Sequence, residues 1–143
     1  MKETDSNKTA AFLLLRLLLG LLFVYAFIGK LKGDANGYTI ANLIGFSQGT
    51  LENFSQNTFL PRLLLVPYCY ALPWLEIGLG LALLLGIKTR LTLIGFGLVL
   101  ISLWFGMLLL KQQAVVLGNA FYVFLSVVAL HLAPYNRFSL TRD

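Results

Sequence analysis

Four apolar stretches constrain the fold of this chain more than any other feature of its sequence. They cover residues 10–31, 63–87, 91–110 and 114–132. A helix needs about 20 apolar residues to cross the roughly 30 Å hydrocarbon core of a bilayer, and each stretch has about that length. The second and third stretches are followed by connections of only a few residues, so the helices on either side must be antiparallel. The sequence therefore predicts an all-α, four-helix transmembrane bundle forming a single domain over residues 1–143.

The composition agrees with lipid as the solvent. The chain is 58% hydrophobic and 12% charged, whereas soluble domains carry about 25% charged residues. Its net charge of +5 comes from basic residues placed singly at the ends of the apolar stretches, with no basic stripe of the kind that binds nucleic acid. We therefore expect the lipid bilayer as a partner and exclude nucleic acid.

The distribution of basic residues predicts an orientation. Cytoplasmic ends of membrane helices carry more Lys and Arg than the opposite ends. With the N-terminus inside, the inner ends hold Lys2, Lys8, Lys88, Arg90, Arg137 and Arg142, and the outer ends hold Lys30, Lys32, Arg62 and Lys111. We expect a multi-pass protein of the inner cell membrane with both termini in the cytoplasm and residues 32–61 outside.

The long connection over residues 32–61 is polar but contains a helical pattern. Ile40, Leu43, Ile44, Leu51 and Phe54 recur at helical spacing. An amphipathic helix, or two, lying in the outer interface would bury this stripe. The alternative is a disordered loop.

Polar residues inside the apolar stretches share helix faces. In the first stretch, steps of three and four residues join Arg16, Gly20, Phe23, Phe27 and Lys30. A charged residue within a membrane span faces protein or a water-filled cavity, and glycine lets a neighbouring backbone come close. This face therefore points into the bundle.

The second stretch carries Pro73, Glu76 and Gly80 on one face. Counting residues from the inner helix ends at about 1.5 Å each places Arg16 roughly 6 Å in depth from Glu76 and Lys30 about 12 Å from it. We therefore expect Arg16 to pair with Glu76, and Lys30 to extend to water or headgroups at the outer interface. Glu76 is either a structural ion-pair partner or a proton-accepting group beside a quinone or substrate, and the sequence leaves both open.

Asn119 and Tyr122 place further polar groups on one face of the fourth stretch. The predicted polar core, which is also the candidate ligand site, consists of Arg16, Lys30, Glu76, Asn119 and Tyr122. The predicted packing positions are Gly20, Pro73, Gly80 and Gly86.

The inventory of reactive residues restricts cofactors. With Cys69 as its one cysteine and His131 as its one histidine, the chain has no CxxC motif and no pair of histidines for a haem, and no metal site is expected. The sequence also carries no flavin, nicotinamide or iron–sulfur signature. Bound quinone is the one redox cofactor for which it leaves room, so we do not expect this chain to be a complete redox enzyme alone.

Two segments resemble a known family. "RLLLGLLFVYAFIGKLKG" (residues 16–33) and "LPWLEIGLGLALLLGIKTR" (residues 72–90) resemble the two signatures of the DoxX/DoxD-like small integral membrane proteins. The matching positions are Arg16, Gly20, Lys30, Pro73, Glu76, Gly86, Thr89 and Arg90. The resemblance implies a four-helix membrane subunit or partner of a quinone- or thiol-linked redox complex, and it supplies no catalytic residue.

Two other functions stay open beside a redox subunit. One is a non-catalytic membrane anchor or assembly factor for a larger complex. The other is a small transporter, which would have to be a homo-oligomer, because four helices without an internal repeat are too few for alternating access in a monomer. The sequence names neither the substrate nor the partner protein.

Overall fold

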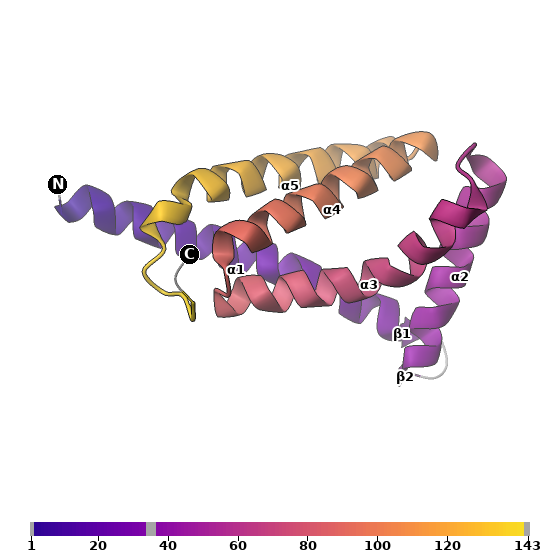
Figure 1. Cartoon of the computed structure of the whole chain (residues 1–143), viewed down its shortest axis with the longest axis horizontal. Helices are drawn as coiled ribbons and strands as arrows, with labels where there is room; N and C mark the ends of the chain where they lie inside the picture. The colour runs from indigo at the N-terminus through magenta and orange to yellow at the C-terminus, as the bar shows by residue number, and fades with distance from the viewer. Residues whose placement is uncertain (1, 34–36, 142–143) are drawn as a thin grey trace.

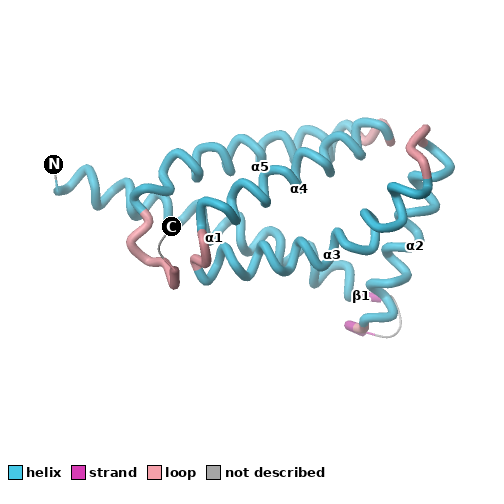
Figure 2. The backbone as a smooth tube through the Cα atoms, viewed as in Figure 1, coloured by secondary structure: helices cyan, strands magenta, loops and turns pink. Residues whose placement is uncertain are grey.

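Four long helices run side by side in the computed structural model, which describes residues 2–33 and 37–141 (Figure 1). The elements in order are α1 (Lys2–Leu31), β1 (Lys32–Gly33), β2 (Gly37–Tyr38), α2 (Ile40–Asn57), α3 (Arg62–Leu85), α4 (Thr89–Leu109), α5 (Gln113–Leu132) and the 3-10 helix η1 (Ala133–Tyr135). Helices α1, α3, α4 and α5 are long and apolar enough to cross a membrane. Figure 2 shows how short the loops between α3, α4 and α5 are. The predicted all-α, four-span bundle is confirmed, and the chain is a multi-pass membrane protein.

Helix α1 begins earlier than the apolar pattern predicted. It extends from Lys2, whereas the first apolar stretch begins at residue 10. Glu3 and Asp5 lie in its first turn, where negative side chains are favoured by the helix dipole. The polar residues before the apolar stretch therefore belong to the same helix.

Helix α2 crosses the ends of the long helices, as the predicted interfacial segment should (Figure 1). The Thr39 side chain caps its first turn by accepting a hydrogen bond from the backbone N–H of Asn42, at 3.3 Å. Leu43, Leu51 and Phe54 are buried against the bundle. The amphipathic prediction is confirmed as one continuous helix.

Two residues of the predicted stripe on α2 are not buried. Ile40 and Ile44 are 61% and 46% exposed. The buried face follows Leu43, Ser47 and Leu51 at steps of four residues, so a small polar side chain belongs to it. Ile40 and Ile44 lie beside that line and are therefore exposed on the surface of α2.

A short antiparallel hairpin, which the sequence did not predict, joins α1 to α2. Lys32 pairs with Tyr38, and Gly33 with Gly37. The Asn42 side-chain amide donates to the carbonyl oxygens of Leu31 and Gly37, both at 2.9 Å. These bonds tie the first turn of α2 to the end of α1, and they fix the direction in which α2 leaves the bundle.

Helices α1 and α3 approach each other most closely at two glycines. A Cβ atom on Gly20 would lie 2.8 Å from the Leu84 side chain and 3.2 Å from the Gly80 carbonyl oxygen. A Cβ on Gly80 would lie 3.1 Å from the Gly20 carbonyl oxygen. Only glycine permits this approach, so Gly20 opposite Gly80 sets the register of the two antiparallel helices.

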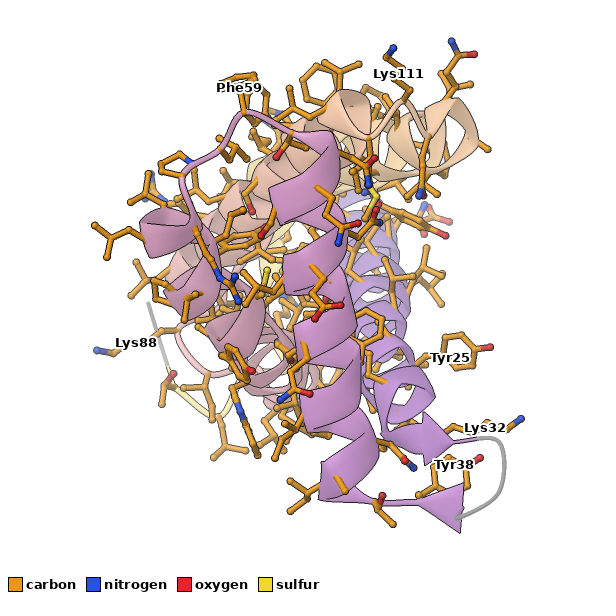
Figure 3. The ribbon with its side chains drawn as sticks, turned by 90° about the vertical axis from the view of Figure 1, so that its right-hand side faces the viewer. Tyr25, Lys32, Tyr38, Phe59, Lys88 and Lys111 are labelled. Atoms are coloured by element: carbon orange, nitrogen blue, oxygen red, sulfur yellow. The ribbon has the colours of Figure 1, made fainter. Side chains whose placement is uncertain are left out.

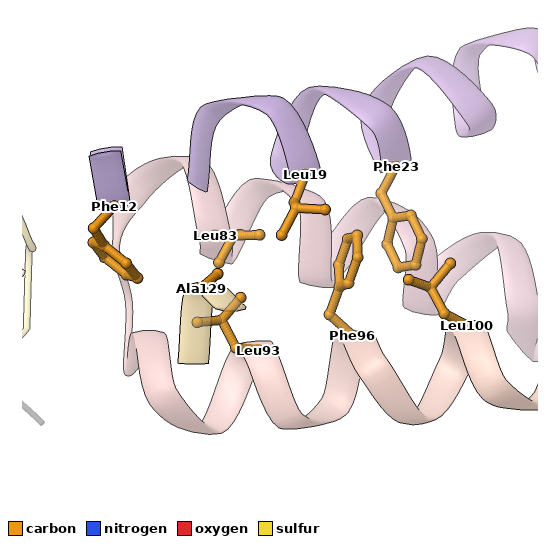
Figure 4. Packing of buried hydrophobic residues seen from close by; sticks show 8 residues of the cluster. All are labelled: Phe12, Leu19, Phe23, Leu83, Leu93, Phe96, Leu100 and Ala129. Carbon is orange, nitrogen blue, oxygen red and sulfur yellow. The ribbon is translucent and has the colours of Figure 1, made fainter. Parts of the chain in front are cut away.

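The main hydrophobic core lies at the crossing of α1, α3, α4 and α5 (Figure 4). The rings of Phe23 on α1 and Phe96 on α4 stack with their centroids 3.9 Å apart. The buried members are Phe12, Leu19, Phe23, Leu83, Leu93, Phe96, Leu100 and Ala129. This core holds the end of the bundle that is remote from α2.

Side chains that suit a membrane interface point outward from the ends of the bundle. Tyr25, Tyr38 and Phe59 are 77%, 65% and 80% exposed, and Figure 3 shows them, with Lys88 and Lys111, directed away from the helices. Aromatic and basic side chains anchor membrane helices at the headgroup level. Their exposure and chemistry therefore suit the headgroup level of a bilayer.

Helix α3 bends in its first half. Pro67 and Pro73 lie inside it, and Figure 1 shows the ribbon curving towards α2. A proline removes a backbone donor and its ring clashes with the carbonyl one turn earlier, which kinks a helix. The bend takes the first half of α3 away from α4 and leaves space between them.

The glycine contact predicts an asymmetric effect of substitution within α3. Gly80→Leu should lower the free energy of unfolding by roughly 1–3 kcal/mol, because the added side chain overpacks the α1–α3 contact. Gly78→Leu is the control, since a Cβ on Gly78 meets nothing within 4 Å and leucine favours helix more than glycine. Thermal unfolding in detergent measures both, and equal losses would contradict the proposed register contact.

Candidate functional site

A buried ion pair joins α1 to α3 near the α2 end of the bundle. The Lys30 ammonium contacts Oε2 of Glu76, and the two side chains are 12% and 3% exposed. The ammonium also lies 5.3 Å from the centroid of the Phe46 ring on α2, within the range of a cation–π contact. The charge of Glu76 in the middle of a membrane helix is therefore compensated by Lys30.

The prediction that Arg16 pairs with Glu76 was wrong. Counting from the helix ends assumed that the ends lie at equal depth, whereas the contact between Gly20 and Gly80 sets the true register. In that register Arg16 lies about eight residues, or roughly 12 Å, from the level of Glu76, and Lys30 lies about six residues, or roughly 9 Å, on the other side. The long lysine side chain spans the smaller offset, so Lys30 does not extend to the interface.

Arg16 instead binds the segment that follows α5. Its guanidinium donates to the side-chain oxygen of Asn136 at 3.1 Å and to the backbone carbonyl of Phe138. The Asn136 amide in turn donates to the Thr89 hydroxyl at 2.8 Å. Arg16 is only 5% exposed, and its Nε has no hydrogen-bond partner among the described residues. Arg16 therefore belongs to a structural network at the end of the bundle remote from α2.

Gly86 provides space for this C-terminal segment to pack against the end of α3. It ends α3 in the left-handed conformation, with a φ of 72°, which favours glycine. A Cβ here would lie 2.8 Å from Nη1 of Arg16 and 2.9 Å from the Cα of Ser139. The glycine serves both the turn and the packing of the C-terminal segment.

A cavity of about 420 Å³ lies between α2, the bent half of α3, α4 and the first turns of α5. Its wall is mostly Leu, Phe, Met and Val side chains. Its polar lining residues are Lys30, Thr50, Tyr68, Ser102 and Asn119. Small-molecule sites commonly have this size and this combination of an apolar wall with a few polar groups, so the cavity is the candidate functional site.

One wall of the cavity depends on a second small core. A Cβ on Gly106 would lie 2.9 Å from the ring of Phe54, so Gly106 lets the α2 side chain reach α4. Phe54 packs there with Leu51, Leu65 and Cys69. Cys69 is 2% exposed and fills this core as a small apolar side chain.

The structure divides the predicted polar core. Lys30 and Asn119 line the cavity, and Glu76 lies behind Lys30 as its ion-pair partner. Arg16 lies at the other end of the bundle, and Tyr122 packs against the main hydrophobic core. The five residues therefore do not form one site.

Sequence reasoning missed Tyr68 and Ser102 as cavity residues. Their hydroxyl oxygens lie 2.8 Å apart. Tyr68, Leu72 and Glu76 follow at steps of four residues, so helical periodicity could have placed the tyrosine on the face of the glutamate. Ser102 gave no such signal, because its position on α4 also suits helix packing.

Known families provide an independent comparison. A family model described as methylamine utilisation protein MauE matches residues 8–117. The chain belongs to the MauE family. No curated protein and no solved structure matches it.

The MauE match overturns the resemblance to DoxX/DoxD-like proteins. Of the positions that carried that resemblance, Gly20 makes the α1–α3 contact, while Arg16, Gly86 and Thr89 hold the C-terminal segment. Small membrane bundles of different families need such glycines and buried polar groups. The short signatures therefore did not discriminate between families.

The ion pair predicts coupled effects of mutation. Removing one partner leaves a buried, uncompensated charge, which typically costs about 3–5 kcal/mol, so Lys30→Met and Glu76→Leu should each lower stability markedly. The double variant should recover much of the loss. Arg16→Met combined with Glu76→Leu is the control and should give additive losses. Thermal unfolding in detergent tests this, and additivity in the Lys30 pair would refute the coupling.

Proposed function

We propose that this chain is the membrane subunit of a MauE-type redox system and that its cavity holds a lipid-soluble quinone. The observation that carries the proposal is the apolar cavity inside the membrane bundle, with a compensated ammonium group in its wall. The family is described by methylamine utilisation, and an amine serves as a fuel only if it is oxidised. Electrons from that oxidation need an acceptor, and quinones are acceptors dissolved in the bilayer.

The residues of the cavity suit such a ligand. Its volume of about 420 Å³ is in the range of ring-sized ligands. The apolar wall would hold the ring, while Lys30 and Asn119 would bind its oxygen atoms through N–H donors. When bound, a quinone supplies reversible two-electron chemistry, and this chain's residues bind it, orient it and keep water from it.

The electrons would come from a partner protein. Among the residues that the structure describes, no group of three or more His, Cys, Asp and Glu side chains could hold a metal ion. Cys69 is buried in the core beside the cavity. A partner protein of the methylamine-utilisation system would supply the electrons in a membrane complex.

Solvent extraction tests the ligand. Protein purified from native membranes in mild detergent should release a quinone that ultraviolet difference spectra detect. Leu103→Trp should abolish the quinone because the larger side chain fills the cavity that Leu103 lines. Leu98→Trp on the same helix should keep it, because Leu98 is 63% exposed and does not line the cavity. Folded wild-type protein without quinone would favour a non-catalytic anchor instead.

The orientation is a second part of the proposal: both termini in the cytoplasm and α2 on the outer face of the inner membrane. Single cysteines at Ser6, Asn57, Gln112 and Leu140, in a Cys69→Ser background, are exposed positions for an impermeant thiol reagent. From outside the cell, we expect labelling at positions 57 and 112 and protection at 6 and 140. The reverse pattern would show the opposite orientation.

A further inference from the structure

The hydroxyl groups in the cavity have a fixed hydrogen-bond direction. The Ser102 hydroxyl donates its one proton to the carbonyl oxygen of Val99 at 2.7 Å. In the 2.8 Å contact with Tyr68, Ser102 must therefore be the acceptor and Tyr68 the donor. A tyrosine has one O–H proton, so its oxygen retains only acceptor capacity. Tyr68 offers the cavity an acceptor and no donor.

Lys30 offers the opposite chemistry. Its ammonium group has three N–H donors and no acceptor, and one of them is directed to Glu76. Glu76 is 3% exposed and does not line the cavity, so it acts through Lys30 as a positioning residue. Asn119 carries both a donor and an acceptor. It can therefore bind a donor or an acceptor atom of the ligand and does not distinguish a quinone from a hydroquinone.

We propose that the cavity selects the reduced, hydroxyl-bearing form of its ring ligand, a hydroquinone, over the oxidised quinone. This inference rests on the proposed function. The oxygen atoms of a quinone only accept hydrogen bonds, so a quinone can use Lys30 but meets a lone pair at Tyr68. A hydroquinone can accept from Lys30 through one oxygen and donate to Tyr68 through the other. The reduced form therefore makes one more hydrogen bond.

One additional hydrogen bond sets the size of the preference. A net gain typical of such bonds corresponds to roughly three- to tenfold tighter binding of the hydroquinone. A tenfold preference would raise the two-electron potential of the bound pair by about 30 mV. The bound quinone would then be reduced more readily than free quinone in the bilayer.

Binding of two defined probes tests the selection. Decylubiquinol and decylubiquinone are titrated anaerobically into the detergent-solubilised protein, stripped of endogenous quinone, and their dissociation constants are measured by calorimetry. Wild type should bind the quinol about three- to tenfold more tightly. Tyr68→Phe should bring the ratio to about one, with quinone binding little changed. Tyr70→Phe is the control on the neighbouring, exposed face of α3 and should behave as wild type.

Ser102→Ala should shift the binding preference in favour of the quinone. Without the serine oxygen, the Tyr68 hydroxyl loses its acceptor and is free to donate into the cavity, so the preference should move towards the quinone. The selection would be overturned if wild type bound quinol and quinone equally well, or bound the quinone more tightly. It would also be overturned if Ser102→Ala left the ratio of the two dissociation constants unchanged. In each case the proposed function would stand, because the protein still binds the probes. If neither probe binds folded wild-type protein, the proposed function falls and this inference with it.

Discussion

The close contact between Gly20 and Gly80 is the constraint on which the rest of the structure depends. It fixes the register of α1 against α3, and the register decides which cation meets Glu76. With Lys30 as that cation, the end of α1 is held against α3. The hairpin and Asn42 then direct α2 across the bundle from that fixed end. The position of α2 closes one side of the cavity, so the contact between two backbones influences a site near the other end of the bundle.

The fold was largely predictable from the sequence because membrane insertion depends on local properties. The length and apolarity of each stretch indicate a spanning helix whatever the neighbouring helices do. The amphipathic segment was predictable for the same reason, apart from Ile40 and Ile44. Its buried face includes Ser47, and a hydrophobic pattern cannot select a serine over two isoleucines.

The site was much less predictable, because it depends on how the helices are placed relative to one another. An error of about four residues in the register changes the depth by about 6 Å, which was enough to exchange Arg16 for Lys30. The cavity requires the proline bend in α3 together with the contact of Phe54 with Gly106. Neither Tyr68 nor Ser102 is unusual in a membrane helix, and only their convergence gives them a common chemistry.

The contact between Arg16 and the C-terminal segment has a consequence for how the protein is made. The acceptors of Arg16 on Asn136 and Phe138 lie 120 and 122 residues later in the chain. During synthesis α1 enters the bilayer long before those acceptors exist, and an arginine in an inserting helix carries a cost that reaches about 2.5–3.5 kcal/mol at the helix centre. Until those acceptors have been made, the Arg16 guanidinium on α1 needs other partners, such as lipid headgroups or water. Residues 136 and 138, which are synthesised much later than α1, complete the environment of its arginine.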